Sequence, residues 1–296
     1  MTEIPYSGEK IAKFGEMEIA YDTFGEPSSP PMLLIMGLGG QMIRWDEVFC
    51  QAIAAQGRWV IRFDNRDVGL STKFDEGGVP DVMALLQGNP GDAPYKLKDM
   101  AADAVGLLDV LGIKAADVVG VSMGGMIAQT MAIHYPDRVR TLTSIMSSTG
   151  NPDLPRPTPE ATAVLVTPPV STMTEYVTNS LNSARVLHGP KYKLDEDYVR
   201  SWAERSYNRC YHPQGFARQL GAILTSESRS ESLANLKIPT LVIHGDADPL
   251  VPVDAGKDTA NSIPGAKLII YEGMGHSFPT ELAPKIIGEI LQHTAP

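Results

Sequence analysis

Ser122 lies in the segment Gly120-Val121-Ser122-Met123-Gly124, in which glycines stand two residues before and two residues after a serine. This spacing is typical of a sharp turn between a strand and a helix that projects the serine hydroxyl out of a sheet. In such a turn the backbone N–H of Met123 points toward the place where negative charge forms on an attacked carbonyl oxygen. The residue types therefore indicate nucleophilic attack by Ser122 on an acyl group.

A serine hydroxyl is a poor nucleophile at neutral pH, so Ser122 needs a base, and that base needs a carboxylate to orient it. We predict His276 as the base, because it follows an apolar strand and has glycines on its amino-terminal side. Asp248 is the predicted acid, with Asp246 as a competitor closer to the preceding strand and Asp153 as a remote third choice. The order serine, acid, histidine is the one expected with a turn of this kind.

A second N–H donor to the developing oxyanion is expected in the glycine-rich stretch 37–41, which follows the apolar run 32–36. Glycines let backbone N–H groups face a ligand without obstruction by a Cβ atom. We predict that the N–H groups of Leu38 and Met123 together form the oxyanion hole. We expect neither a cofactor nor a metal ion, since no group of histidines and carboxylates has the spacing of metal ligands.

The elements that must hold these residues alternate between strand and helix. An antiparallel hairpin is predicted at a sheet edge from residues 10–14 and 16–23. After it, short apolar runs predict buried strands, and stretches with three- and four-residue apolar spacing predict helices. The strands are expected at 32–36, 59–63, 117–120, 141–146, 240–244 and 267–271, and the helices at 45–55, 97–111, 125–135 and 284–293. This alternation favours an α/β fold with a mostly parallel, doubly wound sheet.

The segment from about 150 to 209 interrupts this alternation, because it contains no evident buried strand. It opens with a proline-rich loop and continues with predicted helices at 173–184 and 194–208. We predict a helical cap over residues 150–212, inserted between core segments 1–149 and 213–296. Tyr198 and Trp202, one helical turn apart, either line a cavity or pin the cap helices together.

Composition limits the classes of partner. The chain has 296 residues, a net charge of −10 and a pI of about 5.1, which argue against nucleic acid or an anionic membrane as a partner. The two cysteines, Cys50 and Cys210, are too few for a disulfide framework. We find no basic and apolar leader at the amino terminus and no apolar run long enough to span a bilayer. We expect a cytoplasmic protein without a membrane span, and a homodimer is left open.

Several motifs in a fixed order resemble the α/β-hydrolase family over nearly the whole chain. The matching segments are Met36-Gly37, Asp64-Asn65-Arg66, the turn around Ser122, 135–139, 244–248 and Gly275-His276. The resemblance implies an α/β-hydrolase fold with an inserted helical cap, and the pattern His-Gly-x-x-Asp puts the family's catalytic acid at Asp248. Residues 36–40 and 62–71 resemble the bacterial esterase group that includes aclacinomycin methylesterase. This implies a serine esterase that acts on a small-molecule ester through an acyl-enzyme.

The chain departs from the family pattern at two positions. Met36 stands where many members have histidine, which alters the shape and polarity of the expected pocket. Asp67 stands where many members have glycine. For Asp64 and Arg66 we predict a structural ion pair with each other and no catalytic role, because the order of serine, acid and histidine leaves no place for them.

Other activities are compatible with the same serine, histidine and aspartate. A cofactor-free haloperoxidase or perhydrolase would use hydrogen peroxide where an esterase uses water. An acyltransferase or a carbon–carbon bond hydrolase is a further alternative, and so is a ligand-binding receptor on the hydrolase fold. Epoxide hydrolase and haloalkane dehalogenase activities are excluded, because they need a carboxylate nucleophile at the position of Ser122.

Overall fold

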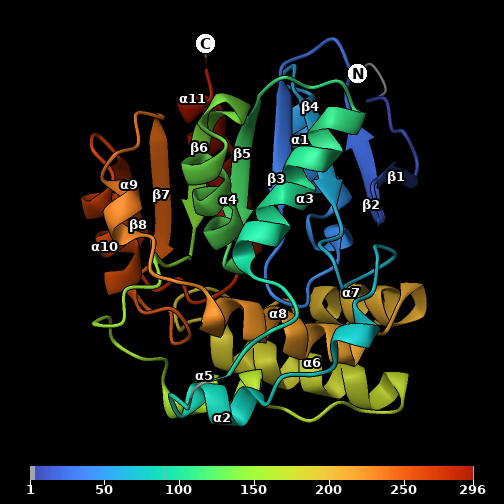
Figure 1. Ribbon diagram of the computed structural model, residues 1–296, viewed down its shortest axis with the longest axis vertical. Helices are drawn as coiled ribbons and strands as arrows, with labels where there is room; N and C mark the ends of the chain where they lie inside the picture. The colour runs from blue at the N-terminus through green and yellow to red at the C-terminus, as the bar shows by residue number, and fades with distance from the viewer. Residues whose placement is uncertain (1–3, 90, 296) are drawn as a thin grey trace.

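A mostly parallel sheet runs through the centre of the molecule (Figure 1). The computed structural model describes residues 4–89 and 91–295. Within these residues the sheet has eight strands in the order β1-β2-β4-β3-β5-β6-β7-β8. Only the pairs β1·β2 and β2·β4 are antiparallel. The strands are β1 Lys10–Phe14, β2 Met17–Phe24, β3 Pro31–Ile35, β4 Trp59–Phe63, β5 Ala116–Val121, β6 Val139–Ile145, β7 Thr240–Gly245 and β8 Lys267–Tyr271. The predicted hairpin and parallel sheet are confirmed.

Helices cover both faces of this sheet, and further helices lie beyond the carboxyl ends of its parallel strands. The α-helices are α1 Glu47–Ala54, α2 Val82–Leu86, α3 Leu97–Val110, α4 Met123–His134, α5 Pro159–Leu165, α6 Met173–Leu187, α7 Glu196–Arg209, α8 Pro213–Thr225, α9 Ser230–Leu233, α10 Val253–Ser262 and α11 Ala283–His293. Short 3-10 helices are η1 Met42–Arg44, η2 Asp75–Gly77, η3 Pro136–Arg138 and η4 Thr280–Leu282. No helix in the described part of the chain is both long enough and apolar enough to cross a membrane.

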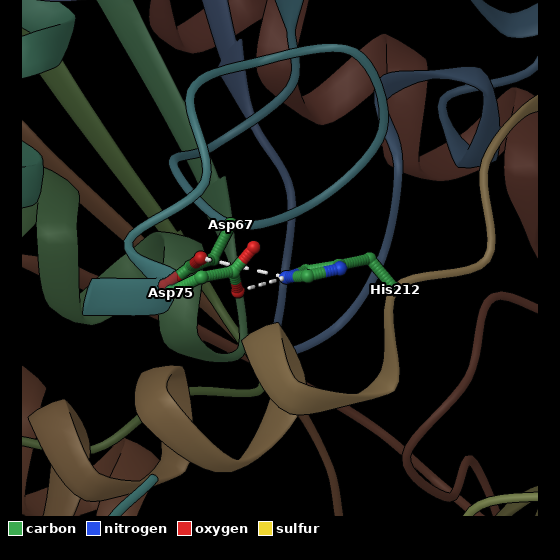
Figure 2. Close-up of side chains that lie close together, drawn as sticks. All are labelled: Asp67, Asp75 and His212. Atoms are coloured by element: carbon green, nitrogen blue, oxygen red, sulfur yellow. Dashed lines mark ion pairs between the residues drawn. The ribbon is translucent and has the colours of Figure 1, made fainter. Parts of the chain in front are cut away.

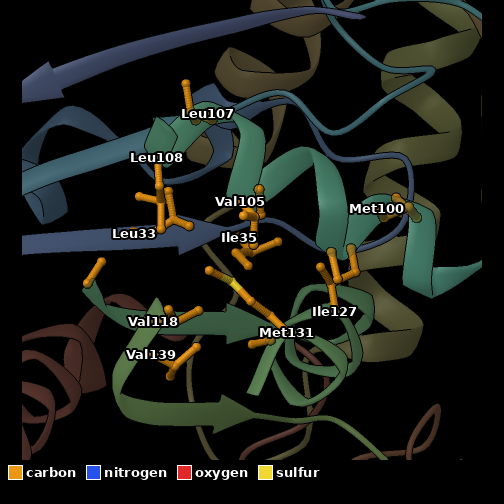
Figure 3. Packing of buried hydrophobic residues seen from close by; sticks show 14 of the residues in the cluster. Leu33, Ile35, Met100, Val105, Leu107, Leu108, Val118, Ile127, Met131 and Val139 are labelled. Atoms are coloured by element: carbon orange, nitrogen blue, oxygen red, sulfur yellow. The ribbon is translucent and has the colours of Figure 1, made fainter. Parts of the chain in front are cut away.

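The run of apolar residues in β3 is explained by its burial on two faces. Side chains of a strand alternate between faces, so Leu33 and Ile35 pack in one core with α3 and α4, as Figure 3 shows. Met32 and Leu34 pack in the other core with α1 and α11. Leu33 also lies in register with Ile61 of β4 and Val118 of β5. A central parallel strand of this kind must be apolar at every position.

The predicted helix 45–55 begins later than expected. Residues 42–44 form the separate turn η1, and α1 starts at Glu47. The reason is Asp46, whose carboxylate accepts a hydrogen bond of 2.7 Å from the backbone N–H of Phe49. Such a side chain at the amino-terminal cap position fixes where a helix starts.

Helices α5, α6, α7 and α8 lie together beneath the carboxyl ends of the parallel strands (Figure 1). They connect β6 to β7 in the chain. The predicted helices at 173–184 and 194–208 correspond to α6 and α7, which pack on each other through Val177, Leu181, Val199 and Ala203. Helices α5 and α8 were not predicted. We keep the name cap for residues 150–212, and this division of the chain remains a prediction.

Candidate active site

Ser122 occupies a strained backbone position at the end of β5. Its φ is +55° and its ψ is −122°, a conformation that residues with side chains rarely adopt. Two glycines make the turn possible. A Cβ atom on Gly120 would lie 2.1 Å from the carbonyl oxygen of Gly124, and one on Gly124 would lie 2.1 Å from that of Ile35. The strand and the helix α4 therefore approach more closely than alanine would allow, and Ser122 projects from their junction.

Two hydrogen bonds connect Ser122 to His276 and His276 to Asp248. The Ser122 Oγ atom lies 2.9 Å from His276 Nε2, and His276 Nδ1 lies 2.7 Å from Asp248 Oδ2. The Asp248 side chain is fully buried, and the side chain of His276 is 9% exposed. The structure thus brings together the three residues predicted as nucleophile, base and acid, and such an arrangement can transfer a proton from a serine hydroxyl to an imidazole.

The surroundings of Asp248 fix its carboxylate. Its Oδ1 atom accepts hydrogen bonds of 2.9 and 2.8 Å from the N–H groups of Leu250 and Val251. His244 Nε2 lies 3.6 Å from Asp248 Oδ2 and 2.7 Å from the carbonyl oxygen of Val251. Burial lowers the pKa of His244. His244 is therefore a neutral, packed neighbour of Asp248, and Asp248 Oδ2 is left to bind His276.

The two competing acids lie in other roles. Asp246 Oδ1 accepts a hydrogen bond of 2.6 Å from the N–H of Gly273, so this carboxylate stabilises the turn after β8. Asp153 is exposed on the loop that follows β6. Among the hydrogen bonds and ion pairs of the described residues, neither carboxylate contacts His276, whose Nδ1 atom is hydrogen bonded to Asp248.

The predicted oxyanion loop lies directly against Ser122. A Cβ atom on Gly37 would be 3.1 Å from the Cβ atom of Ser122. The loop is a tight turn, in which the N–H of Gly40 binds the carbonyl oxygen of Gly37 at 3.1 Å and Gly39 has a φ of +66°. Leu38 occupies the second position of this turn, and Met123 is the first residue of α4. Their role as oxyanion donors remains a prediction.

Helix α8 packs against this loop and is hydrogen bonded to it. The N–H of Gly39 donates to Gln219 Oε1 at 2.8 Å, and a Cβ atom on Gly39 would meet the ring of Phe216 at 2.6 Å. The amide of Asn65 donates to the carbonyl oxygen of Met36 at 2.9 Å. Gln219, which fixes this glycine-rich loop, could not be identified from the sequence, because α8 was not predicted.

The loop that carries His276 is hydrogen bonded to the end of α6. The N–H groups of Gly275 and His276 donate to the carbonyl oxygens of His188 and Leu187, at 3.0 and 2.6 Å. A Cβ atom on Gly275 would lie 2.2 Å from the Leu187 oxygen, so the contact requires glycine there. The Gly-x-Gly pattern before His276 was the available signal for a close approach, but its partner in the cap could not be identified from the sequence.

The predicted ion pair between Asp64 and Arg66 is wrong. Asp64 is fully buried and pairs with Arg209 of α7 at 2.8 Å, while Arg66 pairs with Asp103 of α3 at 2.6 Å. The two side chains leave the loop after β4 in different directions and find partners on different helices. Asp64 also accepts hydrogen bonds from the N–H groups of Met42 and Leu70. Asp64 and Arg209 thus connect the core to the end of α7.

Asp67, which stands where many family members have glycine, has a φ of +72°. Aspartate adopts this left-handed region more readily than most residues. Its carboxylate is held by Arg218, with bonds of 2.8 Å from Nε and from Nη2, and by the hydroxyl of Tyr95 at 2.6 Å. These contacts explain how the position tolerates a side chain in spite of its backbone conformation.

Asp67 also belongs to a cluster with Asp75 and His212, shown in Figure 2, whose potential ligand atoms all lie within 4.8 Å of one another. Three such side chains are able to hold a metal ion. However, Arg218 Nη2 lies 2.8 Å from Asp67, 2.7 Å from Asp75 and 2.9 Å from His212 Nε2. The guanidinium already supplies the positive charge, so we interpret the cluster as an ion-pair network.

Tyr198 and Trp202 contact the core segment that precedes α1. The hydroxyl of Tyr198 donates to Asp46 at 3.0 Å, and the guanidinium of Arg44 lies 3.8 Å from the centroid of the Trp202 ring. Trp202 also packs against the apolar cluster between α6 and α7, which supports the alternative in which it pins the cap helices together, whereas the hydrogen bond of Tyr198 is to the core. The contacts with Asp46 and Arg44 attach α7 to the core.

A surface hollow of about 420 Å³ is lined by residues that include Gly112, Lys114 and Arg138. These residues precede β5 and β6, so they lie at the amino ends of those strands. Ser122 lies at the carboxyl end of β5. Because ligands of open α/β sheets bind beyond the carboxyl ends of the strands, the hollow does not belong to the site around Ser122.

The sequence and the fold of the chain are both similar to those of known proteins. A family described as alpha/beta hydrolase fold matches residues 30–281. A rhodomycin D methylesterase from Streptomyces sp. (strain C5) is 29% identical over 94% of this chain and 95% of the relative. A 2-hydroxymuconate semialdehyde hydrolase from Pseudomonas putida is 30% identical over 67% of this chain and 69% of the relative. The structure of a 2-hydroxy-6-oxo-6-phenylhexa-2,4-dienoate hydrolase from Rhodococcus sp. strain RHA1 superposes with a TM-score of 0.76 at 19% identity, covering 98% of this chain and 99% of that one.

Proposed function

Since the chain belongs to the α/β-hydrolase family, we propose that it hydrolyses carboxylic esters, with Ser122 as nucleophile, His276 as general base and Asp248 as the acid that orients it. The observation that carries this proposal is the pair of hydrogen bonds from Ser122 to His276 and from His276 to Asp248, at 2.9 and 2.7 Å. The similarity to a rhodomycin D methylesterase over 94% of the chain supports an ester as substrate.

In the first half of the reaction, Ser122 Oγ attacks the ester carbonyl carbon while His276 Nε2 takes its proton. Asp248 stabilises the imidazolium through Nδ1–H. The N–H groups of Leu38 and Met123 bind the oxyanion of the tetrahedral intermediate. When the intermediate collapses, the bond to the leaving oxygen breaks, and His276 gives its proton to that oxygen. An alcohol leaves, and the acyl group remains on Ser122.

In the second half, His276 takes a proton from water, and the hydroxide formed attacks the acyl carbon. The second tetrahedral intermediate releases the carboxylic acid, and the proton on His276 returns to Ser122 Oγ. The same donors serve both halves because the charge forms on the same oxygen. These steps need no metal or organic cofactor.

The test is hydrolysis of p-nitrophenyl esters from acetate to palmitate by the wild type, Ser122→Ala and Ser28→Ala. Ser28 is exposed on the loop before β3, at the end of the sheet away from Ser122. We expect Ser122→Ala to lose at least about 1000-fold in kcat, and Ser28→Ala to match the wild type. A fluorophosphonate probe should label the wild type and Ser28→Ala at Ser122. Full activity of Ser122→Ala would contradict the proposal.

Carbon–carbon bond hydrolysis is the second candidate, favoured by the relative that is a 2-hydroxymuconate semialdehyde hydrolase at 30% identity. The same set of assays should therefore include a 2-hydroxy-6-oxo-dienoate. Its cleavage is monitored through the decrease in its visible absorbance. Perhydrolysis is separated by adding hydrogen peroxide and measuring peracid. Turnover of either substrate at a higher kcat/KM than every ester would displace ester hydrolysis as the main activity.

A further inference from the structure

Gln219 is a polar side chain on the buried face of α8. It is fully buried, and an amide in such a place costs free energy unless it is hydrogen bonded. Its Oε1 atom accepts a hydrogen bond of 2.8 Å from the N–H of Gly39, and its Nε2 atom donates one of 2.8 Å to the carbonyl oxygen of Arg66. The orientation of the amide is fixed, because a backbone N–H can only donate and a carbonyl oxygen can only accept. Gln219 thus connects the loop after β3 to the loop after β4.

Residues 37–40, at the start of the loop after β3, form a tight turn. The N–H of Gly40 binds the carbonyl oxygen of Gly37 at 3.1 Å, and Gly39, at the third position, has a φ of +66°. Leu38, at the second position, is not one of the described residues with a positive φ. This combination matches a type II turn, which favours glycine at the third position. The hydrogen bond that closes the turn uses neither the N–H of Leu38 nor that of Gly39.

Gln219 binds one of these two N–H groups and leaves the other free. The N–H of Gly39 donates to Gln219, whereas none of the hydrogen bonds within residues 4–89 and 91–295 starts at the N–H of Leu38. Leu38 follows Gly37, on which a Cβ atom would lie 3.1 Å from the Cβ atom and 3.7 Å from the Oγ atom of Ser122. The free N–H therefore belongs to the residue next to the backbone that touches Ser122, and the bound N–H points to α8.

Other side chains hold the two ends of this loop. The amide of Asn65 donates to the carbonyl oxygen of Met36 at 2.9 Å, and the amide of Gln41 donates to two carbonyl oxygens at the end of α7, both at 2.7 Å. Neither contact involves the peptide group between Leu38 and Gly39. Glycine at the third position lets this peptide group rotate, which interconverts turns of type II and type I. The hydrogen bond from α8 is the contact that opposes this rotation.

We propose that Gln219 is a positioning residue for the oxyanion hole, because its bond to Gly39 holds the turn in the conformation that presents the free N–H of Leu38 to the oxyanion at Ser122. This inference rests on the ester hydrolysis proposed above and names a residue on α8 on which its rate depends. Donors stabilise a transition state best when they are oriented before the charge forms. Loss of the Gln219 amide therefore weakens binding of the transition state more than binding of the ester.

The test compares the p-nitrophenyl ester that the wild type hydrolyses fastest with its thiono analogue, in which sulfur replaces the carbonyl oxygen. Sulfur accepts hydrogen bonds weakly, so the thiono ester gains less from an oxyanion hole. The measured quantity is the ratio of kcat/KM for the oxygen ester to that for the thiono ester, because a general loss of activity cancels in it.

Two variants alter the proposed donor, and two serve as controls. Gln219→Met keeps the length of the side chain and removes its amide. Leu38→Pro removes the N–H at a position where type II turns favour proline. Gln129→Met removes another fully buried glutamine, which is bonded to Ser144 and Arg229 and not to this loop. Asp248→Asn impairs the base instead of the oxyanion donor.

We expect Leu38→Pro to lower the ratio about 100-fold, the effect of removing one oxyanion donor. Gln219→Met should lower it about 10-fold, mainly through kcat of the oxygen ester, because the donor is displaced and not removed. Both controls should keep the wild-type ratio. The double variant with Leu38→Pro and Gln219→Met should have the ratio of Leu38→Pro alone, since Gln219 acts through this N–H.

A wild-type ratio in Gln219→Met or in Leu38→Pro would overturn the inference while ester hydrolysis stands, and so would a double variant with a ratio below that of Leu38→Pro. Failure of ester hydrolysis has a different signature, namely no turnover and no probe labelling of Ser122 in the wild type, and it would overturn both. Circular dichroism checks that each variant folds. If Gln219→Met does not fold, Gln219→Asn replaces it, because its side chain is one methylene shorter and cannot bridge the two loops.

Discussion

His188 Nδ1, at the end of the cap helix α6, lies 2.9 Å from the hydroxyl of Ser277, the residue that follows His276. Together with the backbone hydrogen bonds from Gly275 and His276 to α6, this contact joins the cap to the loop that carries the proposed base. The two segments also fit closely, since a Cβ atom on Gly189 would lie 2.4 Å from the N atom of Gly275. A movement of this end of the cap would therefore displace His276.

The first prediction concerns His188 as a positioning residue. His188→Ala removes the side-chain bond to Ser277 but leaves the backbone bonds, so we expect kcat to fall about 3- to 10-fold with little change in KM, because misplacement of the base affects the chemical step. Ser277→Ala removes the other partner and is the matched control. If the effect runs through this bond, the double variant should be no slower than the slower single variant. An additive loss would show two independent effects.

The second prediction separates the two aspartates of the turn after β7. Asp248→Asn should lower kcat/KM about 1000- to 10,000-fold, since an amide cannot orient His276 and stabilise its charged form in the same way. Asp246→Asn disturbs only the bond to the N–H of Gly273 and should cost less than about 10-fold. Steady-state kinetics on one p-nitrophenyl ester compares them. The reverse order of effects would assign the acid to Asp246.

The third prediction follows from the φ of +55° at Ser122. Strain of this kind costs about 1–3 kcal/mol in residues with a side chain. Ser122→Gly should therefore have a free energy of unfolding about 1 kcal/mol higher than that of Ser122→Ala. Both variants lose the nucleophile, so the comparison isolates the backbone. Urea unfolding followed by circular dichroism provides the measurement, and equal stabilities would argue that the turn is unstrained.

The fourth prediction concerns the buried pair Asp64–Arg209. Burial raises the pKa of Asp64 above its ordinary value of 3.8, and Arg209 opposes that shift. A carboxyl group whose pKa is raised by folding binds more protons in the folded state than in the unfolded state. Its contribution to the free energy of unfolding therefore falls as the pH rises through the range in which the group loses its proton. Arg209→Met removes the cation and should destabilise the protein by about 3 kcal/mol at pH 7.

The destabilisation by Arg209→Met should shrink as the pH is lowered below 7, because a protonated Asp64 needs no cation. Adding Asp64→Asn to this variant should recover part of the loss at pH 7, which distinguishes an unpaired buried charge from lost packing at α7. Unfolding free energies at several pH values give both results. A loss that is independent of pH and is not rescued would mean that packing dominates.

The fifth prediction concerns the cluster of Asp67, Asp75 and His212. Because Arg218 contacts all three, we expect excess EDTA to leave both the melting temperature and the esterase rate unchanged. Thermal unfolding with and without EDTA checks this, with added Zn²⁺ or Ca²⁺ as the complementary arm. A melting temperature raised by several degrees with either ion would show that the cluster binds metal in spite of the guanidinium.

The sequence by itself determined the core of the fold. Apolar runs such as 32–36 predicted buried strands because a central parallel strand has no polar face, and β3 indeed packs in two cores. The turn around Ser122 could be predicted because only glycine fits at positions 120 and 124. Local rules of this kind depend on residues that are adjacent in the chain. A local rule of this kind identified Ser122, while Asp248 and His276 were predicted from the expected order of serine, acid and histidine and, for Asp248, from the family resemblance. The structure brings the three within hydrogen-bonding distance.

Only the tertiary structure decided the partners of charged and polar groups. Asp64 and Arg66 are two residues apart, yet they bind Arg209 and Asp103 on different helices. Gln219, His188 and Arg44 likewise gained their contacts from segments far away in the chain. An ion pair or a stacked guanidinium depends on distances and directions that are set when helices pack on the sheet, and these leave no periodic pattern in the sequence. The candidate catalytic residues were thus readable from the chain, and what holds and surrounds them was not.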